Sequence, residues 1–454
     1  MRTLEQLRDN IRGELIFPGE PGYNDARSVW NGMIDRRPAA VVRAADAADV
    51  IASVDFASET GIPISAKGGG HGVSGKAVRD DGLLVDLVHL NAVQVDEKER
   101  TARVGGGATL GDVDRETQAF GLAVPAGIVS ETGVAGLTLG GGIGYQARKS
   151  GLTIDNLIEA DIVIADGSLV TASADNHTDL FWAIRGGGGN FGIVTSFLYR
   201  LHELGPDVMT SLSYFDIAET ADVLRFYREF MHGAANGCAV YCLFANVPPA
   251  DHFPAERRGM PAVILHACYA GPVEEGRKAL TPLRQFGAPF FRAFDTMKFT
   301  DLQKAFDPAV PKGMRAYWKG LNLEEIEDEL VNVFADRLMT IPGPMSLIGF
   351  EPLGGKVAEV DPSATAYAFR NARFSLGIWS GWDEPAMDEA NIEWTRSLYR
   401  DLEGFTSGGV YVNYLDRDEQ ERTRSALGAN FSRLLEIKQK YDPGNMFIGN
   451  LKID

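Results

Sequence analysis

The chain has 454 residues, a length that predicts two or three domains with a large core. Its 44 Lys and Arg residues against 62 Asp and Glu residues give a net charge of −18, and so acidic a surface excludes nucleic acid and anionic membranes as expected partners. The 45% hydrophobic and 23% charged fractions are those of a folded protein and exclude a disordered one.

Two further features narrow the class of protein. No apolar run reaches the ~18 residues of a membrane helix, and residues 1–17 lack the apolar stretch of a signal peptide, so we expect a cytoplasmic protein. Cysteines occur only at Cys238, Cys242 and Cys268, which excludes a disulfide framework and a cysteine-rich metal site. We expect Cys238 and Cys242 to be core thiols, and we expect no metal.

The first 200 residues alternate short helices with short strands. Asp46 or Asp49 can cap a helix that runs through Phe56, and Asp166-Gly167 predicts the tight turn of a hairpin. The remaining pattern predicts strands at 62–66, 82–87, 102–104 and 193–201, a hairpin at 161–172, and helices at 109–120 and 179–185. The order of these elements indicates an α+β domain with glycine-rich loops between its strands.

From about residue 206 the elements become longer. The pattern predicts helices at 219–233, 273–286, 322–338 and 386–402, with strands near 208–214, 239–245, 261–269, 345–351, 364–369 and 373–379. This arrangement indicates a second domain, an antiparallel sheet backed by helices. The tail is expected to hold an extended segment at 410–414 and a helix at about 418–440.

Glycine is over-represented, with 51 residues, and four runs lie in the first 200 residues: 68–70, 105–107, 140–142 and 186–189. Gly187-x-Gly189-x-x-Gly192 matches a dinucleotide fingerprint, but a predicted helix precedes it and a strand follows, which is the wrong order for a Rossmann site. Gly70-x-x-x-x-Gly75-Lys76 resembles a phosphate loop, but Ala77 stands where a Mg²⁺-binding hydroxyl is needed.

Four segments carry the chemistry. Residues 63–75 form a loop in which consecutive glycines can aim N–H groups at an anion such as a pyrophosphate, with His71 among them. Residues 125–144 are nearly uncharged and contain seven glycines, so they can lie flat against a planar ligand. Residues 151–156 and 185–194 are the third and fourth. Taken alone, His71 also fits an ordinary histidine of a surface loop.

In this order, the four segments resemble the FAD-linked oxidases of the vanillyl-alcohol oxidase and p-cresol methylhydroxylase (PCMH) fold. The tail segments 411–414 and 441–447 resemble the berberine-bridge-enzyme signature. The resemblance implies an α+β chain with a two-subdomain PCMH-type FAD-binding domain at 1–205, a substrate domain at 206–409 and a C-terminal segment at 410–454 that returns to the FAD domain. It also implies that the glycine runs are places where backbone meets FAD.

The resemblance implies one covalent bond to the cofactor. In the family a histidine of the pyrophosphate loop is bonded to the flavin 8α-methyl group, and His71 holds that place. Many members add a cysteine bond, but the matching position is Val129, and no cysteine precedes Cys238. Attachment through His71 alone resembles the 6-hydroxynicotine oxidase branch and favours a small or medium substrate.

Further cofactor contacts follow from the same resemblance. Thr132 falls near flavin C4a, where a small side chain leaves room for O₂, so an oxidase is favoured over a dehydrogenase, although Thr132 also fits a role in packing under the ring. The contacts that the resemblance implies are Lys67, Gly68, Gly69, Gly70, His71, Gly72, Ser74, Val129, Thr132, Gly133, Gly136, Gly140, Gly141, Gly144, Ile193, Val194, Tyr411 and Asn413.

Two residues are candidates for catalysis. Tyr414 matches a flavin-facing tyrosine of the family, and Glu351 occupies a strand position that points to the site in relatives; either can assist proton loss. The alternatives are packing for Tyr414 and a solvated strand position for Glu351. The segment Tyr317–Lys319 resembles a family segment at the pocket rim. Residues 374–379, where some members carry a catalytic glutamate, contain no acid.

The sequence therefore predicts an FAD-dependent oxidase. It takes a hydride from a C–H bond of an alcohol, amine or hydroxylated natural product to flavin N5, and it reduces O₂ to H₂O₂. The alternatives are a dehydrogenase with another electron acceptor and a flavoprotein that binds without turnover. The expected partners are a small-molecule substrate and O₂, and a homodimer is left open.

Overall fold

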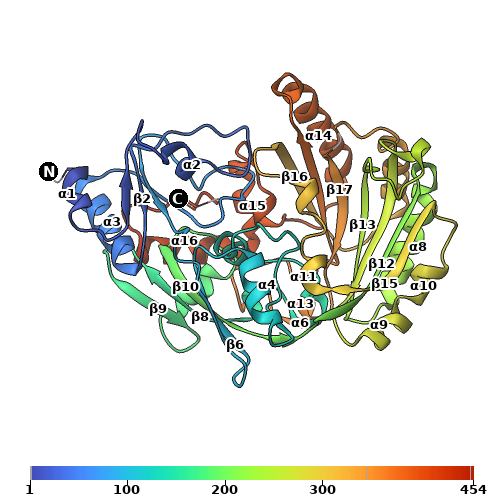
Figure 1. Cartoon of the computed structure of the whole chain (residues 1–454), viewed down its shortest axis with the longest axis horizontal. Helices are drawn as coiled ribbons and strands as arrows, with labels where there is room; N and C mark the ends of the chain where they lie inside the picture. Colours follow the sequence, from blue (N-terminus) through green and yellow to red (C-terminus); the bar gives the residue numbers. More distant parts are fainter. Residues whose placement is uncertain (1–2, 344, 450, 454) are drawn as a thin grey trace.

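The computed structural model describes residues 3–343, 345–449 and 451–453, and within these ranges the strands form four sheets (Figure 1). The first 200 residues make up one part of the molecule, and the strands from Asp207 onward make up the other. The C-terminal segment crosses back to lie among the N-terminal elements. Among the described residues, no helix is long and apolar enough to cross a membrane.

The first sheet carries the loop that contains His71. Its order is β1-β2-β4-β3, with β2, β4 and β3 parallel and β1 antiparallel to β2. Its strands are β1 (Glu14–Ile16), β2 (Ala40–Arg43), β4 (Leu83–Asp86) and β3 (Ile64–Lys67). Helix α3 (Ala47–Thr60) packs on it and is capped by Asp46, one of the two predicted caps, whose side chain accepts from the N–H groups of Ala48 and Asp49.

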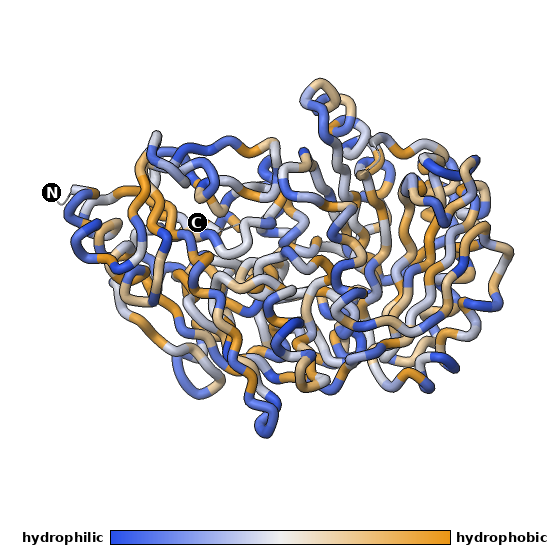
Figure 2. Tube along the Cα trace, viewed as in Figure 1, coloured by the Kyte–Doolittle hydropathy of each residue, from blue (hydrophilic) through white to orange (hydrophobic). Residues whose placement is uncertain are grey.

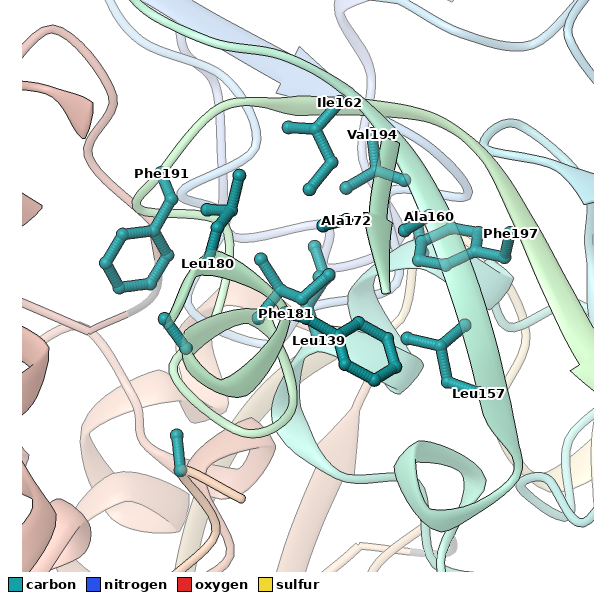
Figure 3. Close-up of a cluster of buried hydrophobic side chains, with 14 of the residues drawn as sticks. Leu139, Leu157, Ala160, Ile162, Ala172, Leu180, Phe181, Phe191, Val194 and Phe197 are labelled. Carbon is teal, nitrogen blue, oxygen red and sulfur yellow. The ribbon is translucent and has the colours of Figure 1, made fainter. Parts of the chain in front are cut away.

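The second sheet is antiparallel and is covered by short helices. Its order is β5-β6-β10-β8-β9, and β8 and β9 form the predicted hairpin. Its strands are β5 (Val93–Asp96), β6 (Thr101–Gly105), β10 (Ile193–Arg200), β8 (Leu157–Val163) and β9 (Leu169–Ser173). Figure 3 shows the core beneath it, where Phe181 of α7 (Thr178–Ile184) and Leu139 of α5 (Val134–Gly140) join strand residues such as Ile162. Because α7 precedes residues 187–192 and β10 follows them, the rejection of a Rossmann site is confirmed.

The third and largest sheet is antiparallel and has seven strands in the described residues. Its order is β15-β12-β14-β13-β17-β18-β16. Its strands are β15 (Phe291–Lys298), β12 (Asp207–Asp216), β14 (Pro261–Tyr269), β13 (Cys238–Asn246), β17 (Leu347–Pro352), β18 (Phe374–Trp382) and β16 (Arg315–Leu323). A small ribbon pairs β7 (Leu122–Ala123) with β11 (His202–Glu203).

Side-chain alternation gives this large sheet two different faces. Along β13, Val240, Cys242 and Phe244 pack under the helices α8 (Thr220–Gly233), α12 (Asp328–Arg337) and α14 (Asp388–Leu402). Tyr241 and Leu243 point to the opposite face, toward the first part of the chain. Figure 2 shows hydrophobic residues concentrated along these strands and hydrophilic ones on the outer loops. Cys238 and Cys242 are free, buried thiols of the helix-covered core, as predicted.

The remaining α-helices are short. They are α1 (Leu4–Arg8), α2 (Tyr23–Arg27), α4 (Leu110–Gln118), α6 (Ala147–Ser150), α9 (Val273–Ala279), α10 (Thr281–Gln285), α11 (Phe299–Leu302), α13 (Lys356–Glu359), α15 (Thr423–Leu427) and α16 (Phe431–Tyr441). Two predicted helices are broken. The one at 273–286 divides into α9 and α10 near Pro282, and the one at 418–440 divides at Gly428, whose φ of 53° lies in the left-handed region.

Three strand predictions in the second part were wrong. The predicted strand at 364–369 is irregular, because Arg370 turns this segment inward to a bidentate pair with Asp155. The edge strands β15 and β16 were missed, and the first residues of the predicted helix at 322–338 belong to the end of β16. The predicted extended segment at 410–414 ends in a single 3₁₀ turn, Val412–Tyr414.

A buried lysine anchors the returning tail. Lys438 Nζ donates to the carbonyl oxygens of Asn190 at 2.8 Å and Phe447 at 2.5 Å, and to the Asp442 carboxylate at 2.6 Å. Lys438→Met should lower the free energy of unfolding by about 3–5 kcal/mol, because it leaves a buried carboxylate without its cation. Chemical denaturation measures this loss. Lys440→Met, which removes an exposed pair with Asp179, should cost about 1 kcal/mol or less. Equal losses in the two variants would contradict the assigned anchor.

Candidate active site

A deep cavity lies between the large sheet and the two sheets of the first part. One wall is the loop after β3, the loop 127–133 and the start of α5. The opposite wall is the outer face of β13, β17, β18 and β16, and the tail residues 411–414 close one side. At the far end the cavity passes between residues 192–194 and 447–449. The cavity is therefore assembled from segments that are far apart in the sequence.

Most of the predicted site residues meet in this cavity. Those that line it are Gly68, Gly69, Gly70, His71, Gly72, Val129, Thr132, Gly133, Gly136, Ile193, Val194, Glu351, Tyr411, Asn413 and Tyr414. They come from three sheets and the tail, and only the folded chain brings them together.

Lys67 and Ser74 lie behind the loop and not on the cavity surface. Lys67 Nζ donates to the carbonyl oxygen of Ala26 at 2.5 Å and lies 3.2 Å from the Asp86 carboxylate. Ser74 is buried. In this structure both residues support the loop from the protein side.

The glycine run at 140–142 and Gly144 also lie outside the cavity lining. A Cβ at Gly140 would stand 2.3 Å from Asn413 Oδ1, and one at Gly144 would stand 1.7 Å from a carbonyl oxygen. Gly141 faces the rings of Tyr367 and Tyr411. The run at 105–107 packs in the same way against the backbone of the segment 87–91. These glycines allow close backbone packing behind the cavity wall.

His71 is held in a fixed orientation within its loop. Its ring stacks on Trp30 with centroids 4.7 Å apart and an interplanar angle of 17°. Its Nε2 atom is buried and has no hydrogen-bond partner among the described residues. Burial lowers the pKa of His71 to about 4, so the ring is neutral at pH 7 and keeps a lone pair for bonding.

Glu351 and Tyr414 form a buried pair at the opposite wall. Tyr414 Oη donates to Glu351 Oε2 at 2.7 Å. Burial raises the pKa of Glu351 to about 7, and the hydrogen bond from Tyr414 opposes that rise. Burial and the Glu351 charge raise the pKa of Tyr414 well above 10, so the phenol stays protonated. The pair therefore offers a carboxylate that titrates near neutral pH and a phenol that orients it.

Aromatic side chains frame this pair. Trp318 of β16 and Trp379 of β18 are cross-strand partners, both line the cavity, and both meet the Tyr414 ring edge-on at 5.9 and 5.4 Å between centroids. Tyr317 and Lys319 point to the other face, where both bond Asp418. Of the segment predicted at the pocket rim, only Trp318 therefore reaches the cavity, because strand residues alternate between faces.

The tail is fixed to α5 by polar contacts. Asn413 Nδ2 donates to Tyr411 Oη at 2.9 Å and to the carbonyl oxygen of Leu137 at 3.3 Å. The N–H of Gly142 donates to Tyr411 Oη at 3.1 Å. These bonds hold Tyr414 against Glu351, so a residue of the last 45 positions completes a site begun by residue 68.

The sequence analysis did not name two aromatic residues of the cavity, Tyr241 and Trp379. Both lie on strands that were predicted, and period-two alternation separates their face from the one beneath the helices. The sequence pattern could not decide which face meets the first domain, because both faces of these strands are apolar.

Comparisons with known proteins agree with this geometry. The family described as FAD binding domain matches residues 38–173, and the one described as berberine and berberine like matches residues 410–453. The FAD-linked oxidoreductase YgaK of Bacillus subtilis is 30% identical over 97% of this chain and 96% of its own. The (R)-6-hydroxynicotine oxidase of Paenarthrobacter nicotinovorans is 28% identical over 98% and 97%.

A solved structure shows the same fold. The 6-hydroxy-D-nicotine oxidase of Arthrobacter nicotinovorans superimposes with a TM-score of 0.86 at 27% identity, over 98% of each chain. The chain therefore belongs to the berberine-bridge-enzyme-like family of FAD-linked oxidoreductases. Its predicted fold, an FAD-binding domain of the PCMH type with a second domain built on an antiparallel sheet, is confirmed.

The residues present fit FAD, which the chain binds. The two loops of the cofactor wall touch through backbone alone, since a Cβ at Gly69 would stand 2.5 Å from the nitrogen of Gly133. A Cβ at Gly136 would meet no atom within 4 Å, so the wall there is flat and open to a planar ring. The neutral His71, with a buried nitrogen that has no partner, stands at the same wall.

Proposed function

We propose that the protein is an FAD-dependent oxidase that removes a hydride from a C–H bond of an alcohol, an amine or a hydroxylated natural product and reduces O₂ to H₂O₂. The observation that supports it most is the Glu351–Tyr414 pair, which lies in the cavity that also contains His71 and the flat glycine wall. Oxidases among the relatives, such as 6-hydroxynicotine oxidase, favour the same chemistry.

The protein's own residues supply the proton transfer. FAD, when bound, supplies a hydride acceptor at N5 and an electron donor to O₂. Glu351 accepts the O–H or N–H proton of the substrate at its carboxylate, while the hydride leaves the neighbouring carbon. Tyr414 donates to Glu351 Oε2 and holds the carboxylate in position. Trp318 and Trp379 exclude water and give the substrate a flat, apolar surface.

We further propose that FAD is attached through His71 alone. The ring is neutral and fixed on Trp30, so its lone pair is available. None of the three cysteines is among the described residues that line the cavity, and all three are buried elsewhere. Val129 and Thr132 line the flavin-facing loop with small side chains, which supports access for O₂ and hence an oxidase.

The expected result of a reoxidation experiment distinguishes oxidase from dehydrogenase. Holoenzyme is photoreduced without oxygen and mixed with air-saturated buffer in a stopped-flow instrument. We expect the flavin absorbance to return within seconds, with one H₂O₂ formed per flavin. Flavin that stays reduced for minutes in air would instead assign a dehydrogenase with another acceptor. A panel of alcohols and amines, each tested for anaerobic bleaching of the flavin, then identifies the substrate class.

A further inference from the structure

One segment of the large-sheet part crosses to the FAD side of the cavity. It comprises residues 303–310, between α11 and β16, and we call it the 303–310 strap. Phe306, Ala309 and Val310 of the strap line the cavity. The strap contacts two separate elements of the cofactor wall, through hydrogen bonds at each of its ends.

The first contact is with the loop 127–132, which carries Val129 and Thr132. Asp307 Oδ1 accepts from the Ser130 N–H at 2.9 Å, and Asp307 Oδ2 accepts from Ser130 Oγ at 2.5 Å. Gln303 Nε2 donates to the carbonyl oxygen of Gly127 at 3.0 Å and to Asp114 Oδ2 at 2.9 Å. Four hydrogen bonds therefore fix the strap to this loop and to α4 beside it.

The second contact leads to His71. Trp30 Nε1 donates to the carbonyl oxygen of Val310 at 2.7 Å, and the Trp30 ring stacks on His71. The backbone N–H of Trp30 also donates to the carbonyl oxygen of Gly70, next to His71 in its loop. Trp30 thus connects the far end of the strap to the histidine ring.

The two contacts fix the distance between the His71 ring and the loop 127–132, which line the same cavity. A bond-forming step requires the reacting atoms to be held about 3–3.5 Å apart, and a misplacement of about 1 Å can cost 10²-fold in rate. We propose that Asp307 is a positioning residue for covalent flavin attachment: its bidentate hold on Ser130 sets the strap, and the strap sets His71 through Trp30. This inference rests on the proposed bond at His71.

The attachment step balances as follows. A bond forms between a His71 ring nitrogen and the flavin 8α-carbon; one C–H bond of the methyl group and the imidazole N–H break. The two electrons reduce the flavin, which takes up the two protons, and O₂ then reoxidises it to give H₂O₂. Asp307 touches none of the reacting atoms, so its effect is on the rate of the step and not on its chemistry.

The test measures attachment separately from binding. Full-length protein is produced under riboflavin limitation, purified as apoprotein and mixed with FAD in air. Bound FAD is measured by flavin fluorescence quenching, and attached FAD by fluorescence of the protein band on a denaturing gel over time. We expect Asp307→Ala to slow attachment roughly tenfold or more, with the affinity for FAD unchanged. Ser130→Ala, which keeps the backbone N–H bond, should slow it less, and Ser130→Thr should restore the wild-type rate.

Two variants separate position from charge. Asp307→Asn removes the charge, which acts on His71 by raising its pKa, but still accepts from the Ser130 N–H and can donate to Ser130 Oγ. We expect it to attach FAD at nearly the wild-type rate. Asp301→Asn, at an exposed position of α11, is the matched control and should have no effect.

Specific outcomes would overturn the inference. It fails if Asp307→Ala attaches FAD as fast as the wild type, or if Asp307→Asn is as slow as Asp307→Ala, since the charge would then be the cause. It also fails if Asp307→Ala loses FAD affinity and attachment in proportion, because that indicates general damage to the fold. If the wild type itself attaches no FAD, the proposed bond at His71 fails, which is a different result.

Discussion

Replacing His71 with alanine should leave the protein able to bind FAD but unable to retain it after denaturation. Wild-type protein precipitated with acid should give a yellow pellet, whereas His71→Ala should release all of its flavin into the supernatant. The physical reason is that His71 is the one nucleophilic side chain whose neutral ring is fixed at the flat glycine wall. The absorbance of pellet and supernatant at flavin wavelengths measures the partition.

A matched control distinguishes this loss from a general effect of removing a histidine. His89→Ala changes an exposed residue outside the cavity lining and should keep the flavin in the pellet. A yellow pellet from His71→Ala would contradict the assignment and would point to a second attachment residue. Free flavin from the wild type would contradict covalent attachment altogether.

Replacing Glu351 with glutamine should slow flavin reduction by about 10²–10⁴-fold, the usual contribution of a general base. Glutamine has nearly the same shape and can still accept from Tyr414, so the cavity geometry is kept. The measurement is the anaerobic rate of flavin bleaching in stopped flow, with any substrate that reduces the wild-type flavin. Glu359→Gln, on the exposed side of α13, is the control and should react at the wild-type rate.

The same pair predicts the pH dependence. Because the base must be ionised and burial raises the pKa of Glu351 to about 7, the wild-type rate should fall as the pH drops below about 7. Tyr414→Phe removes the hydrogen bond that lowers this pKa, so the inflection should move to higher pH. An unchanged profile in Glu351→Gln would show that another group is the base.

Burial of Glu351 also affects stability, with a defined sign. A carboxyl whose folded pKa lies above its unfolded value binds more protons in the native state, so its cost appears as pH rises from about 4.5 to about 7 and is complete above that. Glu351→Gln should therefore unfold at a higher temperature than the wild type at pH 8, and the gain should vanish at pH 4.

Much of the fold followed from local patterns. Asp46 marked the start of α3, Asp166-Gly167 marked the turn between β8 and β9, and apolar alternation marked β12, β13 and β14. These features depend on neighbours within a few residues, so the sequence determines them directly. The edge strands β15 and β16 escaped detection because their outward residues are exposed or charged, and their pairing depends on β12 and β18.

The site residues divide in the same way. The sequence alone determined that a histidine stands in a glycine loop, that no cysteine precedes residue 238, and that an acid and a tyrosine are available at 351 and 414. It could not decide that Lys67 and Gly140 lie behind the cavity wall, because the direction of a side chain or a backbone turn depends on what packs against it.

Only the tertiary structure decided how these parts act together. Glu351 and Tyr414 are 63 residues apart in the chain, Ser130 and Asp307 are 177 apart, and Trp30 and Val310 are 280 apart. No local pattern encodes such contacts, since each arises when the large sheet is placed over the cofactor wall. The sequence determined which chemical groups this protein carries; the packing of its domains decided which of them share a cavity, which are neutral there, and which hold the others in position.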